Sequence, residues 1–444
     1  MKVGFVSLGC SKNLVDTEMM IGLFKNKKYE IVNDPKEAEI IVINTCGFIA
    51  KAKEEAINTI LEMAQYKQNG KCKFLITTGC LVERYKEELE KALPEVDIFL
   101  KYSDYAENKN ESAKIFEKVF EEIENKKVKN DENLTFLNRV ITTGKQYAYI
   151  RIAEGCDNRC TYCAIPYIRG PFASRKIEDI VKETNQIADN GIHEIILIAQ
   201  DTSKYGIDIY GQPMLAKLLK ELCKIDKIKW IRFLYTYPET ITDELIEVVR
   251  DNEKICKYFD IPIQHISDKV LKMMNRKSTG ESIKNTVKKL RRQIPDVVIR
   301  TTVMVGFPGE TDEDFKLLYN YIKEEEFDKL GAFTYSKEDG TPASRIKEQI
   351  HPMTKKFRYN EIMKLQQEIS KKIRNKCLNK ELEVLIEGET DDKKYWYGRS
   401  YMEVPDIDGV VYVIKNDNKN NIIGKYVRCK IEEVLEYDMI GRLY

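Results

Sequence analysis

Histidine, tryptophan and long apolar runs are all scarce in this sequence of 444 residues. It has two tryptophans and three widely spaced histidines, His193, His265 and His351. Because the histidines are few and far apart, we expect neither a His-rich metal site nor several histidine general bases. No apolar run approaches the roughly 18 residues of a membrane-spanning helix, and the start MKVGFVSLGC lacks the zones of a signal peptide. We therefore expect a globular protein of the cytoplasm, with no membrane partner.

An excess of charge of one sign is also missing. Lys and Arg number 73 and Asp and Glu number 72, for a net charge of +1, so no global basic field favours nonspecific binding to nucleic acid. At about 150 residues per domain, the length predicts two to four domains. Eleven cysteines, an odd number in a long chain without a secretion signal, favour reduced thiols, some of them metal-bound, over a disulfide framework.

In the N-terminal third, strand-like runs alternate with helical stretches, which predicts an open parallel α/β domain. The candidate strands are residues 3–7, 40–44, 74–78 and a fourth near 96–100. Cys10, Cys46 and Cys80 follow the first three, each beside a glycine. Since the carboxyl ends of parallel strands share one edge, where ligands bind, the three cysteines should converge. A buried thiol in a strand-ending turn is the ordinary alternative for any one of them, and three together favour a shared site.

A second trio of cysteines follows a charged stretch and the candidate strand 147–153. In the run A-E-G-C-D-N-R-C-T-Y-C-A-I-P, Cys156, Cys160 and Cys163 have the spacing CxxxCxxC. Such a loop suits a cube-shaped iron-sulfur cluster, because three thiolates hold three corners and leave the fourth iron open. A structural zinc would need a fourth ligand, and no Cys or His follows closely. Zinc and a chance cluster of thiols remain the alternatives.

At this motif the sequence resembles the radical S-adenosylmethionine enzymes. The resemblance implies that the open iron binds the amino and carboxyl groups of S-adenosylmethionine, and that an electron from the cluster cleaves this cofactor to methionine and a 5′-deoxyadenosyl radical. It also implies a partial (β/α)6 barrel. With the strand before Cys156, six strands are expected, the others being residues 194–198, 230–234, 258–263, 298–305 and 330–335. The cluster loop would then lie at the carboxyl end of the first strand, where such barrels place their chemistry.

The pairing of this barrel with an upstream cysteine trio resembles the methylthiotransferases over essentially the whole chain. In that family the N-terminal trio holds a second 4Fe-4S cluster with an open iron, and Cys10, Cys46 and Cys80 match it by motif. Short runs in residues 376–444, separated by Gly, Asn and Asp, predict a small five-stranded antiparallel β-barrel that resembles the TRAM module. The expected divisions are an N-terminal methylthiotransferase domain at 1–125, a linker at 126–141, a radical core at 142–372 and the TRAM barrel at 375–444.

Two subfamilies differ in substrate. The strings S-L-G-C-S-K-N-L-V-D, N-T-C-G-F-I, L-Y-T-Y-P, D-I-P-I-Q-H and G-A-F-T-Y-S resemble the RimO family, which methylthiolates an aspartate β-carbon in small-subunit ribosomal protein number twelve. The C-terminal region has eleven Lys and Arg against fourteen Asp and Glu, so it suits a basic protein better than a phosphate backbone, and direct RNA binding is not expected. A transfer RNA adenosine methylthiotransferase is the first alternative. A noncatalytic iron-sulfur or zinc scaffold is the second.

The resemblance implies that S-adenosylmethionine is both the methyl donor and the radical source. The radical removes a hydrogen from the aspartate β-carbon, and the carbon radical meets sulfur on the second cluster. A one-electron reductant such as flavodoxin or ferredoxin is the implied partner. We hypothesise that both open irons face one cavity between the N-terminal domain and the barrel.

Contacts with the cofactor are predicted at four residues, and no catalytic residue is assigned. Tyr162 resembles the aromatic residue whose backbone contacts the adenine in radical enzymes. Gln200, Arg232 and Gln264 lie at or near predicted strand ends that face the same mouth. Each of the four also has a purely structural interpretation. The remaining thiols are expected to be ordinary; they are Cys72, Cys223, Cys256, Cys377 and Cys429.

Overall fold

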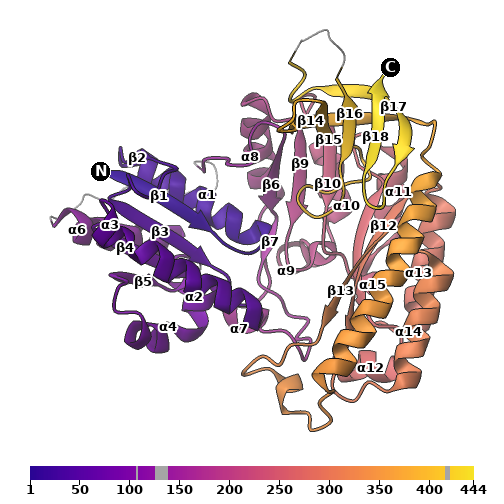
Figure 1. Ribbon diagram of the computed structural model, residues 1–444, viewed down its shortest axis with the longest axis horizontal. Helices are drawn as coiled ribbons and strands as arrows, with labels where there is room; N and C mark the ends of the chain where they lie inside the picture. The colour runs from indigo at the N-terminus through magenta and orange to yellow at the C-terminus, as the bar shows by residue number, and fades with distance from the viewer. Residues whose placement is uncertain (107–108, 126–138, 416–420) are drawn as a thin grey trace.

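The computed structural model of the chain describes residues 1–106, 109–125, 139–415 and 421–444. It has an N-terminal α/β part, a central part in which helices cover curved sheets, and a C-terminal β-barrel (Figure 1). Most of the linker expected at 126–141 lies outside the described residues. In the part of the chain that is described, no helix is both long enough and apolar enough to cross a membrane.

The N-terminal part is a five-stranded parallel sheet in the order β2-β1-β3-β4-β5. Its strands are β1 (Lys2–Ser7), β2 (Glu30–Ile31), β3 (Ile40–Thr45), β4 (Phe74–Gly79) and β5 (Ile98–Leu100). Its helices are α1 (Ser11–Asn26), α2 (Ala50–Ala64), α3 (Tyr66–Asn69), α4 (Cys80–Ala92), α5 (Tyr102–Ala106) and α6 (Lys109–Glu124). All residues of the central strand β3 are buried, since α1 and α6 cover one face of the sheet and α2 and α4 the other. The expected open parallel α/β domain is confirmed.

The central part has six parallel strands in two three-stranded sheets, β10-β9-β6 and β11-β12-β13. Their bounds are β6 (Tyr147–Arg151), β9 (Glu194–Ile198), β10 (Trp230–Phe233), β11 (Tyr258–Gln264), β12 (Val298–Val305) and β13 (Lys329–Thr334). A parallel bridge between Ile231 and Ile255 joins the two sheets. The short strands β7 (Ala153–Glu154) and β8 (Ala173–Ser174) pair beside the cluster loop. This is the partial barrel that the sequence predicts.

Helices surround the central strands, and their apolar sides form one large core with them. They are α7 (Ile165–Ile168), α8 (Ile177–Asp189), α9 (Ile207–Tyr210), α10 (Leu215–Cys223), α11 (Asp243–Asp251), α12 (Asp268–Met273), α13 (Gly280–Gln293), α14 (Asp312–Glu325) and α15 (Pro352–Asn375). The last of these, α15, packs against β13 and leads into the C-terminal barrel.

The C-terminal part is a closed barrel in the order β14-β15-β16-β18-β17. Its strands are β14 (Glu381–Glu389), β15 (Tyr395–Arg399), β16 (Val411–Ile414), β17 (Tyr426–Val434) and β18 (Met439–Leu443). The predicted five-stranded barrel is confirmed. Its strand pairs are antiparallel except that β16 runs parallel to β18. The reason is geometric: directions cannot alternate all the way round a closed ring with an odd number of strands.

Candidate functional site

The N-terminal cysteines lie at the carboxyl edge of the first sheet. Cys10 follows β1 and precedes α1, Cys46 follows β3, and Cys80 is the first residue of α4. The loops that carry Cys10 and Cys46 are in contact. A Cβ atom added at Gly9 (φ +88°) would lie only 2.7 Å from the Cβ of Cys46. Two of the three thiols, Cys10 and Cys80, thus stand at helix N-termini.

Asn13 ties these loops together, and the sequence analysis did not single it out. This fully buried side chain donates through Nδ2 to the carbonyls of Leu8 (3.0 Å) and Thr45 (2.9 Å). Asn44 in turn donates to the carbonyl of Asn13 at 2.8 Å. The loops that carry Cys10 and Cys46 are thus held by one amide. Its place three residues after Cys10, in the first turn of α1, is the signal that could have found it.

Burial opposes ionisation of two of these thiols, Cys46 and Cys80. It raises the pKa of Cys80 to about 11, although the nearby Arg169 guanidinium acts in the opposite direction. Burial also raises the pKa of Cys46. Thiolates are the form that binds metal, so assembly of a cluster on these residues must release protons.

The second trio lies in the loop after β7. The backbone N–H of Cys163 donates to the carbonyl of Cys160 at 3.0 Å, and burial raises the pKa of Cys163 to about 12. Thr161 anchors this loop, donating to the carbonyls of Met274 (3.0 Å, from the backbone) and Met273 (2.8 Å, from Oγ1). The cluster loop is therefore held against the end of α12.

The donor sets suit iron-sulfur clusters with one open iron better than single ions. All eleven cysteines are free, and each trio offers three soft thiol ligands. Among the described residues, no three His, Cys, Asp or Glu side chains converge tightly enough for a single metal ion. A four-iron cube is wider than one ion and holds its thiolates further apart. Each trio thus offers the thiol ligands that the motifs predict for a cluster.

One contact between the N-terminal and central parts links the two trios. Cys80 packs with Ala164 and Ile168, which follow Cys163 directly and belong to α7 and its N-cap. The helices α4 and α7 are in contact, and both lie in the lower part of the N-terminal half of the molecule (Figure 1). The arrangement that would contradict a shared site, with the trios on opposite faces, is not what the structure has.

Of the predicted cofactor contacts, Gln200 and Gln264 lie at the carboxyl ends of central strands, and Tyr162 lies in the cluster loop. Gln200 follows β9 and donates through Nε2 to Glu154 at 2.6 Å. Gln264 ends β11 with a φ of +66°. Tyr162 packs against the apolar cluster that contains Phe307 and Tyr335.

Arg232 requires a correction. Its guanidinium is 1% exposed and donates to Glu194 Oε1 (2.5 Å) and to the carbonyls of Tyr401 (2.5 Å) and Ser400 (2.8 Å). The last two residues belong to the C-terminal part, which closes this side of the central strands. Because Nε and both terminal nitrogens of Arg232 are engaged by Glu194 and the C-terminal part, we withdraw it as a cofactor contact.

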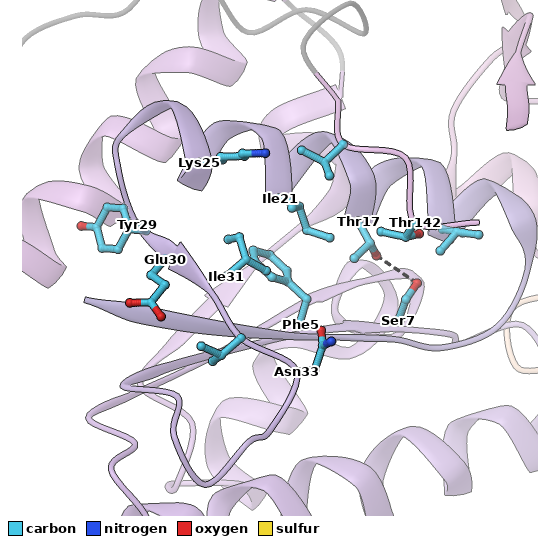
Figure 2. Close-up of a pocket in the computed structure, with 13 residues that line it drawn as sticks. Phe5, Ser7, Thr17, Ile21, Lys25, Tyr29, Glu30, Ile31, Asn33 and Thr142 are labelled. Atoms are coloured by element: carbon cyan, nitrogen blue, oxygen red, sulfur yellow. Dashed lines mark hydrogen bonds between the residues drawn. The ribbon is translucent and has the colours of Figure 1, made fainter. Parts of the chain in front are cut away.

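A cavity of about 670 Å³ lies elsewhere in the N-terminal domain, between α1 and the edge formed by β1 and β2 (Figure 2). Phe5, Ile21 and Ile31 give it apolar walls, and a hydrogen bond of 2.9 Å from Thr17 to Ser7 closes one end. None of the predicted cluster or cofactor residues lines it.

Comparison with known proteins divides the chain in the same way. Residues 2–101 match the uncharacterized protein family UPF0004, residues 150–322 the radical SAM superfamily, and residues 380–443 the TRAM domain. Named relatives match over the full length. Ribosomal protein uS12 methylthiotransferase RimO of Alkaliphilus oremlandii is 58% identical over 100% of this chain and 99% of its own. The protein of the same name from Acetivibrio thermocellus is 50% identical over 100% of this chain and 98% of its own. The one from Clostridium perfringens is 52% identical over 99% of this chain and 97% of its own.

The chain belongs to the RimO family. Solved structures of low identity share the fold. TsrM of Kitasatospora setae, a radical S-adenosylmethionine methyltransferase with cobalamin and a [4Fe-4S] cluster bound, is 13% identical with a TM-score of 0.55, over 85% of this chain and 78% of its own. OxsB, a cobalamin-dependent S-adenosylmethionine radical enzyme, is 13% identical with a TM-score of 0.50, over 84% and 56%. The chain therefore shares its overall fold with these structures.

Proposed function

We propose that this radical S-adenosylmethionine methylthiotransferase modifies the β-carbon of an aspartate in ribosomal protein uS12. The observation that carries the proposal is the packing of Cys80, from the first trio, against residues that follow the second trio, in a chain whose full-length relatives bear the uS12 methylthiotransferase name.

In this proposal Cys156, Cys160 and Cys163 hold the cluster that binds S-adenosylmethionine, and the N-terminal trio, Cys10, Cys46 and Cys80, holds a second 4Fe-4S cluster. When bound, the two clusters and S-adenosylmethionine supply the electron, the hydrogen-abstracting radical, the inserted sulfur and the methyl group. The chain's own residues position these groups: Cys10 and Cys80 stand at helix N-termini at the carboxyl edge of the first sheet.

The cofactor contacts that we retain are Tyr162, Gln200 and Gln264. Gln200 is held by Glu154, at the start of the cluster loop. Its amide is therefore fixed at the carboxyl edge of the strands, where β/α barrels bind their ligands. Tyr162 lies between two cluster ligands and packs against the apolar residues at the opposite side of the same edge.

The proposed substrate is a basic protein loop, the proposed electron donor is a flavodoxin or ferredoxin, and the proposed location is the cytoplasm. The acidic excess of the C-terminal barrel supports a basic partner. We also propose the domain bounds 1–125, 142–372 and 375–444, joined by a linker at 126–141.

Mass spectrometry of ribosomal protein uS12 and of transfer RNA from a strain that lacks this chain tests the substrate. We expect the aspartate to lose its methylthio group while the adenosine modification persists. The reverse pattern would establish the transfer RNA alternative. If reduced, reconstituted protein never forms 5′-deoxyadenosine from S-adenosylmethionine, the chain is a scaffold and not an enzyme.

A further inference from the structure

Arg169 belongs to the central domain, but its side chain is inserted into the N-terminal domain. It caps α7, which begins two residues after Cys163, and its backbone N–H donates to the carbonyl of Ile165 at 2.8 Å. The side chain is only 2% exposed. A buried arginine must find partners for its five N–H donors, and here most of them come from the neighbouring domain.

The two ends of this guanidinium face different groups. Nη1 pairs with Asp16 Oδ2 at 2.7 Å and Glu154 Oε2 at 3.3 Å. Nη2 donates to Asn13 Oδ1 and to the sulfur of Cys80, the latter at 3.5 Å. The ring of Tyr102 stacks on the guanidinium, 3.9 Å from its central carbon. The carboxylates balance the charge, and Nη2 remains directed at a predicted cluster ligand.

Domain docking alone does not require the contact with sulfur. Arg139 offers the comparison, since it also joins the two domains as a buried side chain, between Glu18 of α1 and Glu183 of α8, both at 2.9 Å. No contact of Arg139 with a cysteine is seen in the described part of the chain. Arg169 differs because it contacts both Cys80 and Asn13, the residue that ties the other two cysteine loops.

We propose that Arg169 is a positioning residue for the N-terminal cluster, supplied by the domain that carries the other cluster. Its N–H groups stabilise the thiolate of Cys80, orient Asn13 and so complete the second site only when the domains are docked. Hydrogen bonds and positive charge at cluster sulfurs favour the reduced, more negative form. Arg169 therefore raises the reduction potential of this cluster. This inference rests on the proposed second cluster.

The test uses the full-length chain with Cys156, Cys160 and Cys163 all replaced by Ala, so that only the N-terminal cluster contributes to the signal. Arg169→Met, Arg169→Lys and the control Arg139→Met are reconstituted anaerobically in this background. Iron and sulfide are counted, and the midpoint potential is measured by a redox titration followed by electron paramagnetic resonance. Lysine keeps the positive charge beside Asp16. Its single ammonium group cannot at the same time replace the second guanidinium nitrogen of Arg169, which contacts the sulfur of Cys80.

We expect about four irons per chain in the background and in Arg139→Met, with the same midpoint potential. Arg169→Met should lose iron, and Arg169→Lys should keep iron at a more negative potential. A potential for Arg169→Lys equal to that of Arg139→Met would overturn the inference alone, even if Arg169→Met does not fold. A background chain without any iron would refute the second cluster and the inference together.

Discussion

At the scale of single residues, Arg232, Glu194 and Arg399 form a fully buried group of charges between the central strands and the C-terminal barrel. Glu194 accepts from Arg232 at 2.5 Å and from Arg399 at 2.8 Å, and all three side chains are at most 1% exposed. Breaking a buried ion pair by removing one partner costs about 3 to 5 kcal/mol, because a charge is left uncompensated.

Replacement of Arg232 by methionine should therefore lower the free energy of unfolding by about 3 kcal/mol and leave the affinity for S-adenosylmethionine nearly unchanged. Denaturant unfolding and equilibrium binding to the reconstituted protein measure the two quantities. Arg442→Met is the control, since its exposed pair with Glu432 contributes at most about 1 kcal/mol. A large loss of affinity with unchanged stability would restore Arg232 as a cofactor contact.

Sequence reasoning failed at Arg232 for a physical reason. Alternate residues of a strand face opposite sides, and Arg232 shares the face of Trp230, which packs against Tyr426 with ring centroids 4.8 Å apart. Whether that face lines a mouth or meets another domain depends on residues about 170 positions away. Local pattern does not contain this information.

His265 allows a prediction about pH. The ring is fully buried, and Nδ1 accepts from the backbone of Ser267 at 3.0 Å, so its proton is on Nε2. Burial lowers the pKa of His265 to about 4, while Asp314 raises it and Arg358 lowers it further. The unfolded chain therefore binds the proton first as pH falls from about 6.5 to 4.

Over that window this residue should reduce the free energy of unfolding by about 1.4 kcal/mol for each unit that the pH falls, and it should have no effect above pH 7. His265→Gln removes the titrating group. The difference in unfolding free energy between variant and wild type, measured at pH 7.5, 6 and 5, should shift steadily in favour of the variant. A difference that is the same at all three values would contradict the assignment.

At the scale of elements, the loop after β13 fastens the N-terminal domain to the barrel. Glu338 is buried in this loop and accepts from the backbone N–H of Ala50 at 3.0 Å, at the start of α2. It also pairs with Lys53 (2.8 Å) and with Arg84 of α4 (3.2 Å). One carboxylate thus joins a helix N-terminus and two cations across the interface.

Glu338→Gln should loosen the docking without disturbing the core. Because a small misplacement of reacting groups costs up to about a hundredfold in rate, methylthio transfer should fall by roughly tenfold to a hundredfold while cleavage of S-adenosylmethionine persists. Hydrogen exchange should quicken at residues 49–53. Glu244→Gln, in an exposed pair with Lys220, is the control. Equal losses of methylthio transfer and of S-adenosylmethionine cleavage would show that Glu338 stabilises the radical core and not the docking of the N-terminal domain.

The elements themselves were largely predictable. The central strands are short and almost wholly apolar runs, so their positions follow from hydrophobic pattern. The strand β2 was missed, because two residues give no periodicity. The parallel pair in the small barrel was missed because closure, a property of the whole ring, determines it.

At the scale of the whole molecule, the proposed function divides the reaction between two cysteine trios in different domains. Cys46→Ala should keep formation of 5′-deoxyadenosine and lose methylthio transfer, because it disrupts only the N-terminal site. Cys160→Ala should lose both. Chromatography of the nucleoside, mass spectrometry of the product and iron counts, expected at about eight irons per chain for the wild type, measure these outcomes. Loss of 5′-deoxyadenosine in both variants with only about four irons in the wild type would argue for a single cluster.

The cysteines could be predicted because their spacing and their places after strands are properties of the sequence. Asn13 and Arg169 could not, since polar residues of these types are common and their roles arise from contacts between domains. The proposed metal ligands were thus predictable from the sequence, whereas the residues that hold them in place were not.

The most direct test of the central claim is an anaerobic reaction of the reconstituted protein with ribosomal protein uS12, S-adenosylmethionine and a one-electron reductant, followed by mass spectrometry of the substrate. We predict a mass gain of one methylthio group on a single aspartate, absent from the Cys46→Ala and Cys160→Ala proteins. Formation of 5′-deoxyadenosine by the wild-type protein with uS12 left unmodified, and with transfer RNA methylthiolated instead, would contradict the account.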